Sequence, residues 1–143
     1  MTPGAIFPLV NIVALSTWLA LMIRPRHPLV LRCAGQWVPL LFAMIYTVII
    51  VMRIGRGEGG FNSLAGVAAL FRDPWFLLAG WVHYLAFDLL IGAWEVRDAA
   101  SRNLPRWRVV PCLLLTFLFG PAGWLLYQAA RSMPGESRNH PMS

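Results

Sequence analysis

Charged side chains are scarce in this sequence. They make up 13% of its 143 residues, whereas a soluble domain carries about a quarter. The shortage is uneven, because most of the charges collect between long apolar runs. Long apolar runs without charges cannot form the water-exposed surface of a soluble domain. The composition therefore indicates a membrane protein, with the lipid bilayer as its expected partner.

Lysine is absent, and all twelve basic residues are arginine. The net charge of +6 is spread over every connector between the apolar runs. Nucleic-acid binding requires a continuous basic face, so no nucleic-acid partner is expected. Arginines at the ends of apolar runs are typical of anchoring against anionic lipid headgroups.

Cysteine and histidine are also rare. Cys33 and Cys112 form no Cys-x-x-Cys pair, and no histidine–cysteine cluster has the spacing of a metal site. Only His83 lies inside an apolar run, which argues against haem. We therefore expect no metal and no cofactor. Alternating helix directions would allow a bridge between the two cysteines, but buried free thiols are the expectation.

Four apolar runs alternate with arginine-bearing connectors: 5–23, 36–52, 75–94 and 109–130. Each has roughly the 17–25 residues that cross a bilayer as a helix. We predict an all-α membrane protein with four transmembrane helices in a single domain, 1–132, followed by a polar, disordered tail, 133–143. The first run lacks the basic flank and the cleavage site of a signal peptide, so we expect it to be retained.

The longest connector, 53–74, contains a second apolar pattern. After a glycine-rich start, apolar residues recur at three- and four-residue spacing from Phe61 to Phe71, behind a candidate cap at Asn62 or Ser63. This predicts a short amphipathic helix between the second and third transmembrane helices. It would serve as a surface anchor or, alternatively, as a lid.

Gly120 and Pro121 interrupt the fourth run near its middle. Proline removes a backbone hydrogen bond, so we expect the helix to kink or break there, with freed carbonyls that need a partner. Four spans would place both termini on one side. The first and third connectors hold seven arginines and the opposite side five, so the positive-inside rule puts both termini outside the cytoplasm, across a bacterial inner membrane.

His83 and Asp88 are ionisable side chains inside the third apolar run. Such a group costs about 2.5–3.5 kcal/mol at the bilayer centre, which makes it a candidate functional residue. At about 100° per residue, Trp81, Tyr84, Asp88 and Glu95 form one stripe, and His83 lies about 140° from Asp88. The two are therefore not a natural pair within one helix. Asp88 is expected to bond Tyr84 or a polar group on another span.

A buried, protonated Asp88 and a neutral His83 would suit general acid–base chemistry on an apolar substrate. The residues alone leave two alternatives open. These side chains could form structural hydrogen bonds between helices, or they could conduct ions or protons. Further residues at membrane depth are candidates to line a site for an isoprenoid or conjugated ligand. For each aromatic ring among them, packing in the core is the more ordinary role. These candidates are Trp18, Trp81, Trp124, Asn11, Tyr46, Gly120 and Pro121.

Two segments, Gly80–Asp98 and Val110–Gly123, resemble the abscisic-acid-deficient-four family of small membrane proteins, also described as neoxanthin-synthase-like. Phe61–Phe71 fits the same pattern. The resemblance covers most of the chain, from Asn11 and Trp18 to the end of the fourth run, and is most specific over residues 80–98.

The resemblance implies an integral membrane protein connected with xanthophyll metabolism. In plant members the conversion turns the epoxide violaxanthin into the allene neoxanthin, a redox-neutral isomerisation that needs no metal or nicotinamide. Carried over to this chain, Asp88 would be the acid, His83 the base and Tyr84 an orienting donor, with Gly120 and Pro121 exposing backbone groups nearby.

A cofactor-independent isomerase acting on a carotenoid or other isoprenoid, or a carotenoid-binding protein, is therefore the leading hypothesis. The alternative is a non-enzymatic membrane scaffold or assembly factor. In that case the polar stripe of the third helix would dock a partner or close a homo-oligomer.

Overall fold

The computed structural model describes residues 2–133, and every regular element in that range is helical. The segments are α1 (Pro3–Ile23), α2 (Pro28–Arg32), the π-helical η1 (Cys33–Trp37), α3 (Val38–Arg53), α4 (Leu64–Leu70), α5 (Pro74–Ser101), α6 (Arg106–Phe119) and α7 (Pro121–Ser132). The predicted all-α class is confirmed. Apart from Met133, the tail predicted to be disordered lies outside the described residues.

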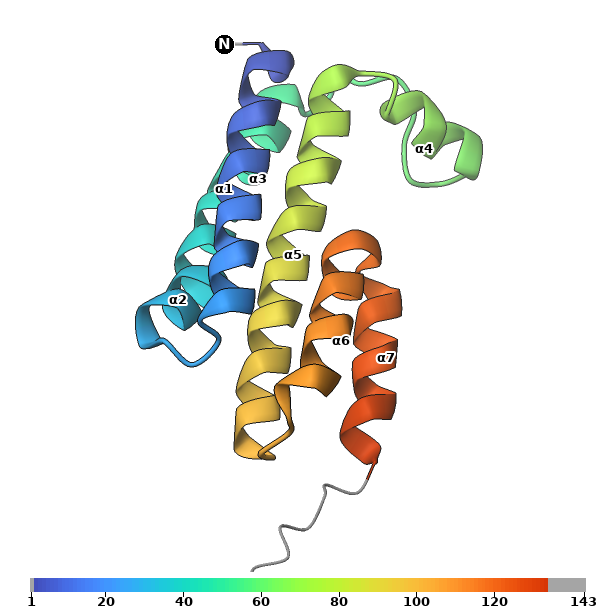
Figure 1. Cartoon of the computed structure of the whole chain (residues 1–143). Helices are drawn as coiled ribbons and strands as arrows, with labels where there is room; N and C mark the ends of the chain where they lie inside the picture. The colour runs from blue at the N-terminus through green and yellow to red at the C-terminus, as the bar shows by residue number, and fades with distance from the viewer. Residues whose placement is uncertain (1, 134–143) are drawn as a thin grey trace, which may run out of the picture.

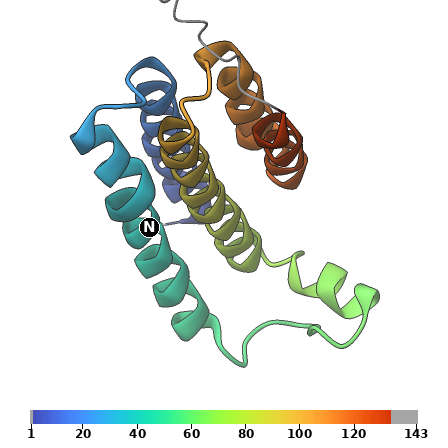
Figure 2. The same cartoon turned by 90° about the horizontal axis from the view of Figure 1, so that it is seen from below.

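Three helices are long and apolar enough to cross a membrane: α1, the continuous helix Pro28–Arg53 and α5. The second of these is made of α2, η1 and α3 in succession. In Figures 1 and 2, α5 lies between α1 and α3 on one side and the α6–α7 pair on the other. It packs against all four of these helices, so it is the central element of the bundle.

The fourth apolar run does not cross the bundle as one helix, so the prediction of four transmembrane helices is not confirmed. The described residues form three candidate spans and a helical hairpin. The chain reverses at Gly120, and α6 and α7 lie side by side in opposite directions (Figure 1). Gly120 has a positive φ of 36°, and Pro121, which follows it, has no N–H to continue the hydrogen bonds of α6. With 14 residues, α6 is about 21 Å long, which is too short for the roughly 30 Å hydrocarbon core.

The hairpin changes where the last described helix ends. The start of α1 and the end of α7 lie at opposite ends of the bundle in Figure 1. The prediction that both termini share one side of the membrane rested on a fourth span, and it stays a prediction. The start of α6 and the end of α7 both lie at the end of the bundle where α1 meets α2.

The second span begins at Pro28 rather than at residue 36, so Pro39 lies well inside it. The π-helical turn Cys33–Trp37 comes just before Pro39, and Val38 N–H donates to the carbonyl of Cys33. A π turn redistributes the backbone hydrogen bonds next to the proline, which has no donor of its own, so the helix continues through it.

The short amphipathic helix predicted between the second and third spans is confirmed as α4. Ser63 is its cap, since the Ser63 hydroxyl accepts a hydrogen bond of 3.0 Å from the backbone N–H of Gly66. Leu70 is buried, and the ring of Phe71 lies against Gly80 of α5. Phe61 and Leu64 remain exposed beside the bundle end, as an interfacial anchor requires.

Asp73 fixes the start of α5. Its Oδ1 accepts a hydrogen bond of 2.8 Å from the backbone N–H of Trp75, and its Oδ2 accepts one from Arg53 at the end of α3. The Arg53 guanidinium, followed by the Trp75 N–H, lowers the pKa of Asp73 below its ordinary value. This carboxylate therefore ties the second span to the third at one end of the bundle.

Candidate functional site

Asp88 lies midway along α5 and is 5% exposed, and its carboxylate faces the tip of the α6–α7 hairpin. A methyl group at residue 120 would lie 2.7 Å from Asp88 Oδ1, so the backbone and the carboxylate approach closely only because residue 120 is glycine. The first turn of α7 begins at the same place. The positive end of a helix dipole and its free N–H groups favour an oxygen acceptor there.

One oxygen of Asp88 remains without a partner. Tyr84, one helical turn earlier, interacts with the carboxylate, yet Oδ2 is buried and accepts no hydrogen bond from any described residue. A buried unsatisfied oxygen costs about 1–3 kcal/mol, so such atoms are uncommon unless they serve a purpose. Asp88 is therefore available to a hydrogen-bonding or reacting group that enters the site.

A row of polar and aromatic side chains leads from α1 to Asp88. The indole N–H of Trp81 donates a hydrogen bond of 3.1 Å to Asn11 Oδ1, and the Trp81 ring stacks on Tyr84 with centroids 5.6 Å apart. Phe7 of α1 contacts the same indole, with centroids 5.8 Å apart. The structure thus brings together Asn11, Trp81, Tyr84 and Asp88, four of the residues that the sequence predicted for the site.

This row is open toward the side of the bundle. The α6–α7 hairpin covers α5 only from its tip to the C-terminal end of α5, and the first half of α5 extends beyond it (Figure 1). Trp81 is 39% exposed there. An apolar pocket of about 310 Å³ adjoins the indole, between the start of α1 and the start of α5. An apolar molecule in the bilayer could reach Trp81 and Tyr84 sideways.

Glu95 is a second carboxyl group on the same stripe of α5, and it is fully buried. The hydroxyl of Thr116 on α6 lies 3.0 Å from Glu95 Oε1 and 3.2 Å from Oε2, and donates to this carboxylate. Gly123 of α7 packs directly on Thr116, where a methyl group would overlap the Thr116 backbone. Sequence analysis placed Glu95 on the stripe of Asp88 but did not identify Thr116 as its partner.

A family model named ABA DEFICIENT 4-like matches residues 5–127, which is most of the chain. The chain belongs to this family. It is the neoxanthin-synthase-like family that the sequence segments resembled. Comparisons with the curated proteins and with the solved structures give no match.

In this ABA DEFICIENT 4-like protein, His83 does not lie with Asp88. Its ring contacts Tyr46 of α3 and Phe87, with centroids 5.6 Å and 4.6 Å apart. The hairpin tip, by contrast, is on the Asp88 side of α5. The predicted acid–base pair of His83 and Asp88 is therefore not assembled within this chain, and Tyr46 belongs with His83.

Trp18 packs in the core of the bundle rather than lining the open face. It is fully buried against Gly92 of α5 and Phe117 of α6, where a methyl group on Gly92 would collide with the indole. Its indole N–H has no hydrogen-bond partner among the described residues. Trp124 is 42% exposed on α7, and Pro121 is exposed at the hairpin tip beside Gly120.

A third carboxylate, Asp98, closes the polar stripe at the end of α5. It accepts a hydrogen bond of 2.7 Å from the hydroxyl of Tyr127 and forms ion pairs with Arg102 and Arg131. Three carboxylates of α5 thus contact successive parts of the hairpin: Asp88 its tip, Glu95 its middle and Asp98 its open end. Asp98 and its partners hold the hairpin in place and leave Asp88 as the carboxylate with a free oxygen.

The described residues contain no group of three potential metal ligands among His, Cys, Asp and Glu. Both cysteines are free. Cys112 is buried with its thiol donating to the carbonyl of Arg108, and Cys33 is half-buried in the π-helical turn.

Proposed function

We propose that the open face of α5 binds an oxygen-bearing polyene of the xanthophyll class, and that Asp88 transfers a proton to and from it. The observation that carries this proposal is the buried Asp88 carboxylate, whose Oδ2 has no partner among the described residues although it lies next to a bilayer-accessible aromatic row. Membership of the neoxanthin-synthase-like family supports the choice of ligand class.

The proposed chemistry converts an epoxide at one end of the polyene into a hydroxyl group and an allene. Asp88 in its neutral form donates a proton to the epoxide oxygen, and the bond from that oxygen to the carbon next to the polyene breaks. A proton then leaves the adjacent polyene carbon, and its bonding electrons form the second of two cumulated double bonds. Asp88, now a carboxylate, accepts that proton, so atoms and electrons balance without an oxidant or a reductant.

The other side chains of the row serve to bind and orient the ligand in this proposal. Trp81 and Phe7 offer flat apolar surfaces to a conjugated chain, and Asn11 holds the indole by its hydrogen bond. The Tyr84 hydroxyl, beside Asp88, can orient the epoxide oxygen. His83 has no step in this scheme because it packs on the α3 side of α5.

The test is pigment analysis in a carotenoid-producing host that carries Asp88→Asn. Asparagine keeps the size of the side chain but can neither donate nor accept the acid proton, so the isomerised product should disappear while membrane abundance is maintained. Asp98→Asn is the matched control, because it removes a carboxylate that holds the hairpin rather than one at the open face. Unchanged product in the Asp88→Asn strain would refute the proposal.

One observation favours the scaffold alternative. The position of Asp88 next to the first turn of α7 would also suit a purely structural contact that fixes the hairpin against α5. In that case Asp88→Asn would lower the stability or abundance of the protein. The pigment composition of the host would be the same with the variant as with the unmodified protein.

The arrangement also supports an orientation in the membrane. Among the described residues, eight arginines lie at the end of the bundle where α1, α5 and α7 finish, and three lie at the other end. The eight are Arg24, Arg26, Arg32, Arg97, Arg102, Arg106, Arg108 and Arg131; the three are Arg53, Arg56 and Arg72. From the positive-inside rule we propose that the arginine-rich end lies in the cytoplasm and the start of α1 on the opposite side.

A further inference from the structure

We propose that the turn between α1 and α2, together with the start of α6, is a binding site for the phosphate headgroup of an anionic phospholipid. Four basic side chains surround one pocket of about 470 Å³ at this turn: Arg24, Arg26, His27 and Arg106. The remaining lining residues are apolar, namely Ile23, Pro25 and Pro28, and none of the described lining residues is acidic.

The positive charge of this pocket is not neutralised within residues 2–133. Neither Arg24 nor Arg26 forms an ion pair in that range. Asp98, the carboxylate at the same end of the bundle, is paired with Arg102 and Arg131. An anion that enters the pocket would therefore meet guanidinium groups without a competing carboxylate partner.

Arg106 is held in place by the end of α1. Its Nη2 donates to the carbonyl oxygens of Met22 and Ile23, at 3.1 Å and 3.4 Å, which are among the acceptors that the last turn of a helix leaves unsatisfied. These bonds fix a planar guanidinium at the edge of the pocket. A fixed guanidinium loses little conformational entropy when it binds phosphate oxygens through two parallel N–H groups.

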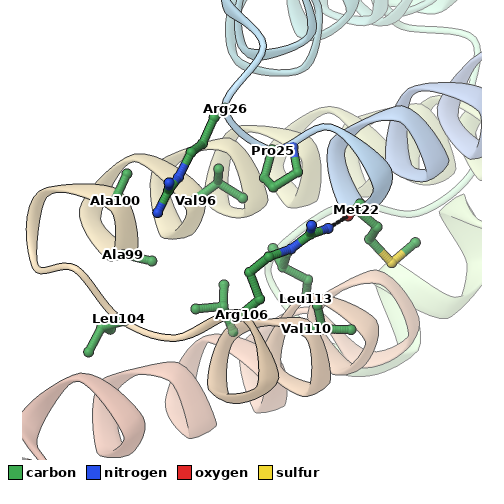
Figure 3. Close-up of a pocket in the computed structure, with 11 residues that line it drawn as sticks. Met22, Pro25, Arg26, Val96, Ala99, Ala100, Leu104, Arg106, Val110 and Leu113 are labelled. Atoms are coloured by element: carbon green, nitrogen blue, oxygen red, sulfur yellow. Dashed lines mark hydrogen bonds between the residues drawn. The ribbon is translucent and has the colours of Figure 1, made fainter. Parts of the chain in front are cut away.

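An apolar cleft lies behind the basic pocket and makes the site suited to a lipid. Pro25, Arg26 and Arg106 line both cavities. Figure 3 shows Arg26 pointing from the turn after α1 toward Val96 and Ala100 of α5, and Arg106 pointing from the start of α6 toward Met22. The other side chains of the cleft are apolar: Met22, Val96, Ala99, Ala100, Leu104, Val109, Val110 and Leu113.

The size of this cleft, about 40 Å³, admits only a small apolar group next to a headgroup. The rest of an acyl chain would lie in the bilayer along Ile23, which is 67% exposed at the mouth of the basic pocket. A charged pocket beside an exposed apolar residue at the end of a membrane span matches an amphiphilic anion better than a fully soluble one.

The test is a lipid titration followed by native mass spectrometry of the detergent-solubilised protein, with phosphatidylglycerol as the probe and phosphatidylcholine as the zwitterionic reference. Arg26→Gln should weaken phosphatidylglycerol binding by about fivefold, the effect of roughly 1 kcal/mol for one basic residue near a lipid phosphate. Arg32→Gln is the matched control, since Arg32 is an exposed arginine at the same end of the bundle but outside the pocket.

Equal losses in the two variants would mean diffuse attraction to the whole arginine-rich end and would overturn the proposal. Inorganic phosphate supplies the second arm. If the lipid phosphate is the ligand, millimolar inorganic phosphate should not displace phosphatidylglycerol; displacement at that concentration would identify a free phosphate site instead. Because Arg26 lies far from Asp88 along the bundle, neither result depends on the proposed proton transfer.

Discussion

The carboxylate of Asp88 lies so close to Gly120 that no side chain fits between the central helix and the hairpin tip. A methyl group on residue 120 would stand 2.7 Å from Asp88 Oδ1, and Gly120 itself has a positive φ of 36°. The reversal of the fourth apolar run and the position of the candidate acid therefore depend on the same glycine.

Gly120→Ala should destabilise the protein for two reasons that add. An L-residue at this φ is strained by about 1–2 kcal/mol, and the new methyl group would push the Asp88 carboxylate away. We expect a loss of about 2 kcal/mol or more in the free energy of unfolding, measured by denaturant titration in detergent micelles. Gly4→Ala is the control, since nothing lies within 4 Å of a methyl group there. Equal stability of the two variants would contradict the tight approach at Gly120.

Thr116→Val should lower the free energy of unfolding, because Glu95 loses its hydrogen-bond partner. Valine keeps the shape of the side chain but removes the only hydroxyl that donates to Glu95 among the described residues, leaving a buried carboxyl group unsatisfied. The expected loss is about 1–3 kcal/mol of unfolding free energy. Thr47→Val serves as control, because the Thr47 hydroxyl is exposed and bonds only the carbonyl of Ala43 in its own helix. A Thr116→Val protein as stable as the control would show that the Glu95 contact contributes nothing.

The helical periodicity of the third run predicted much of this arrangement. It placed Asp88 on one stripe with Trp81, Tyr84 and Glu95, and the structure has Asp88 and Glu95 facing the hairpin, with Trp81 and Tyr84 continuing the row beyond its tip. The separation of His83 from Asp88 follows from the same angle. Which residues share a face of one helix follows from their spacing in the sequence, so the sequence alone is enough to find such a stripe.

The hairpin could not be derived in the same way. Hydropathy measures how many apolar residues follow one another, and the fourth run is long enough to span. Gly120-Pro121 predicts an interruption, but a kink and a full reversal have the same local sequence. The reversal depends on the positive φ of Gly120 and on the packing of Gly123 against Thr116, which are tertiary contacts. For this reason the fourth predicted span is not confirmed.

The Arg53–Asp73 ion pair predicts a pH dependence at the junction of the second and third spans. The pKa of Asp73 is lowered below its ordinary value of 3.8, chiefly by the hydrogen bond from Arg53. A lowered folded-state pKa contributes stability that is present above the unfolded value and is lost as the pH falls through the folded value. The stability difference between the protein and Asp73→Asn should therefore be constant near neutral pH and shrink below about pH 4.

Measuring unfolding of both proteins by denaturant titration from neutral pH to pH 3 would check this dependence. Arg56→Gln is the control, since Arg56 is an exposed arginine near the junction but outside the ion pair. Arg56→Gln should leave the low-pH profile unchanged. A stability difference for Asp73→Asn that persists unchanged to pH 3 would contradict the assigned role of this carboxylate.

The side of the membrane at which each terminus lies is the most direct test of the hairpin. Thr2 and Ser132 are exposed at opposite ends of the bundle, so single cysteines placed there should react with a membrane-impermeant maleimide from opposite sides. Both native cysteines are first replaced by serine, since they are free thiols. With the arginine-rich end in the cytoplasm, Thr2→Cys should be labelled in intact cells and Ser132→Cys only after the membrane is opened. Labelling of both in intact cells would mean that the chain crosses the membrane an even number of times, which contradicts three spans followed by a hairpin that does not cross.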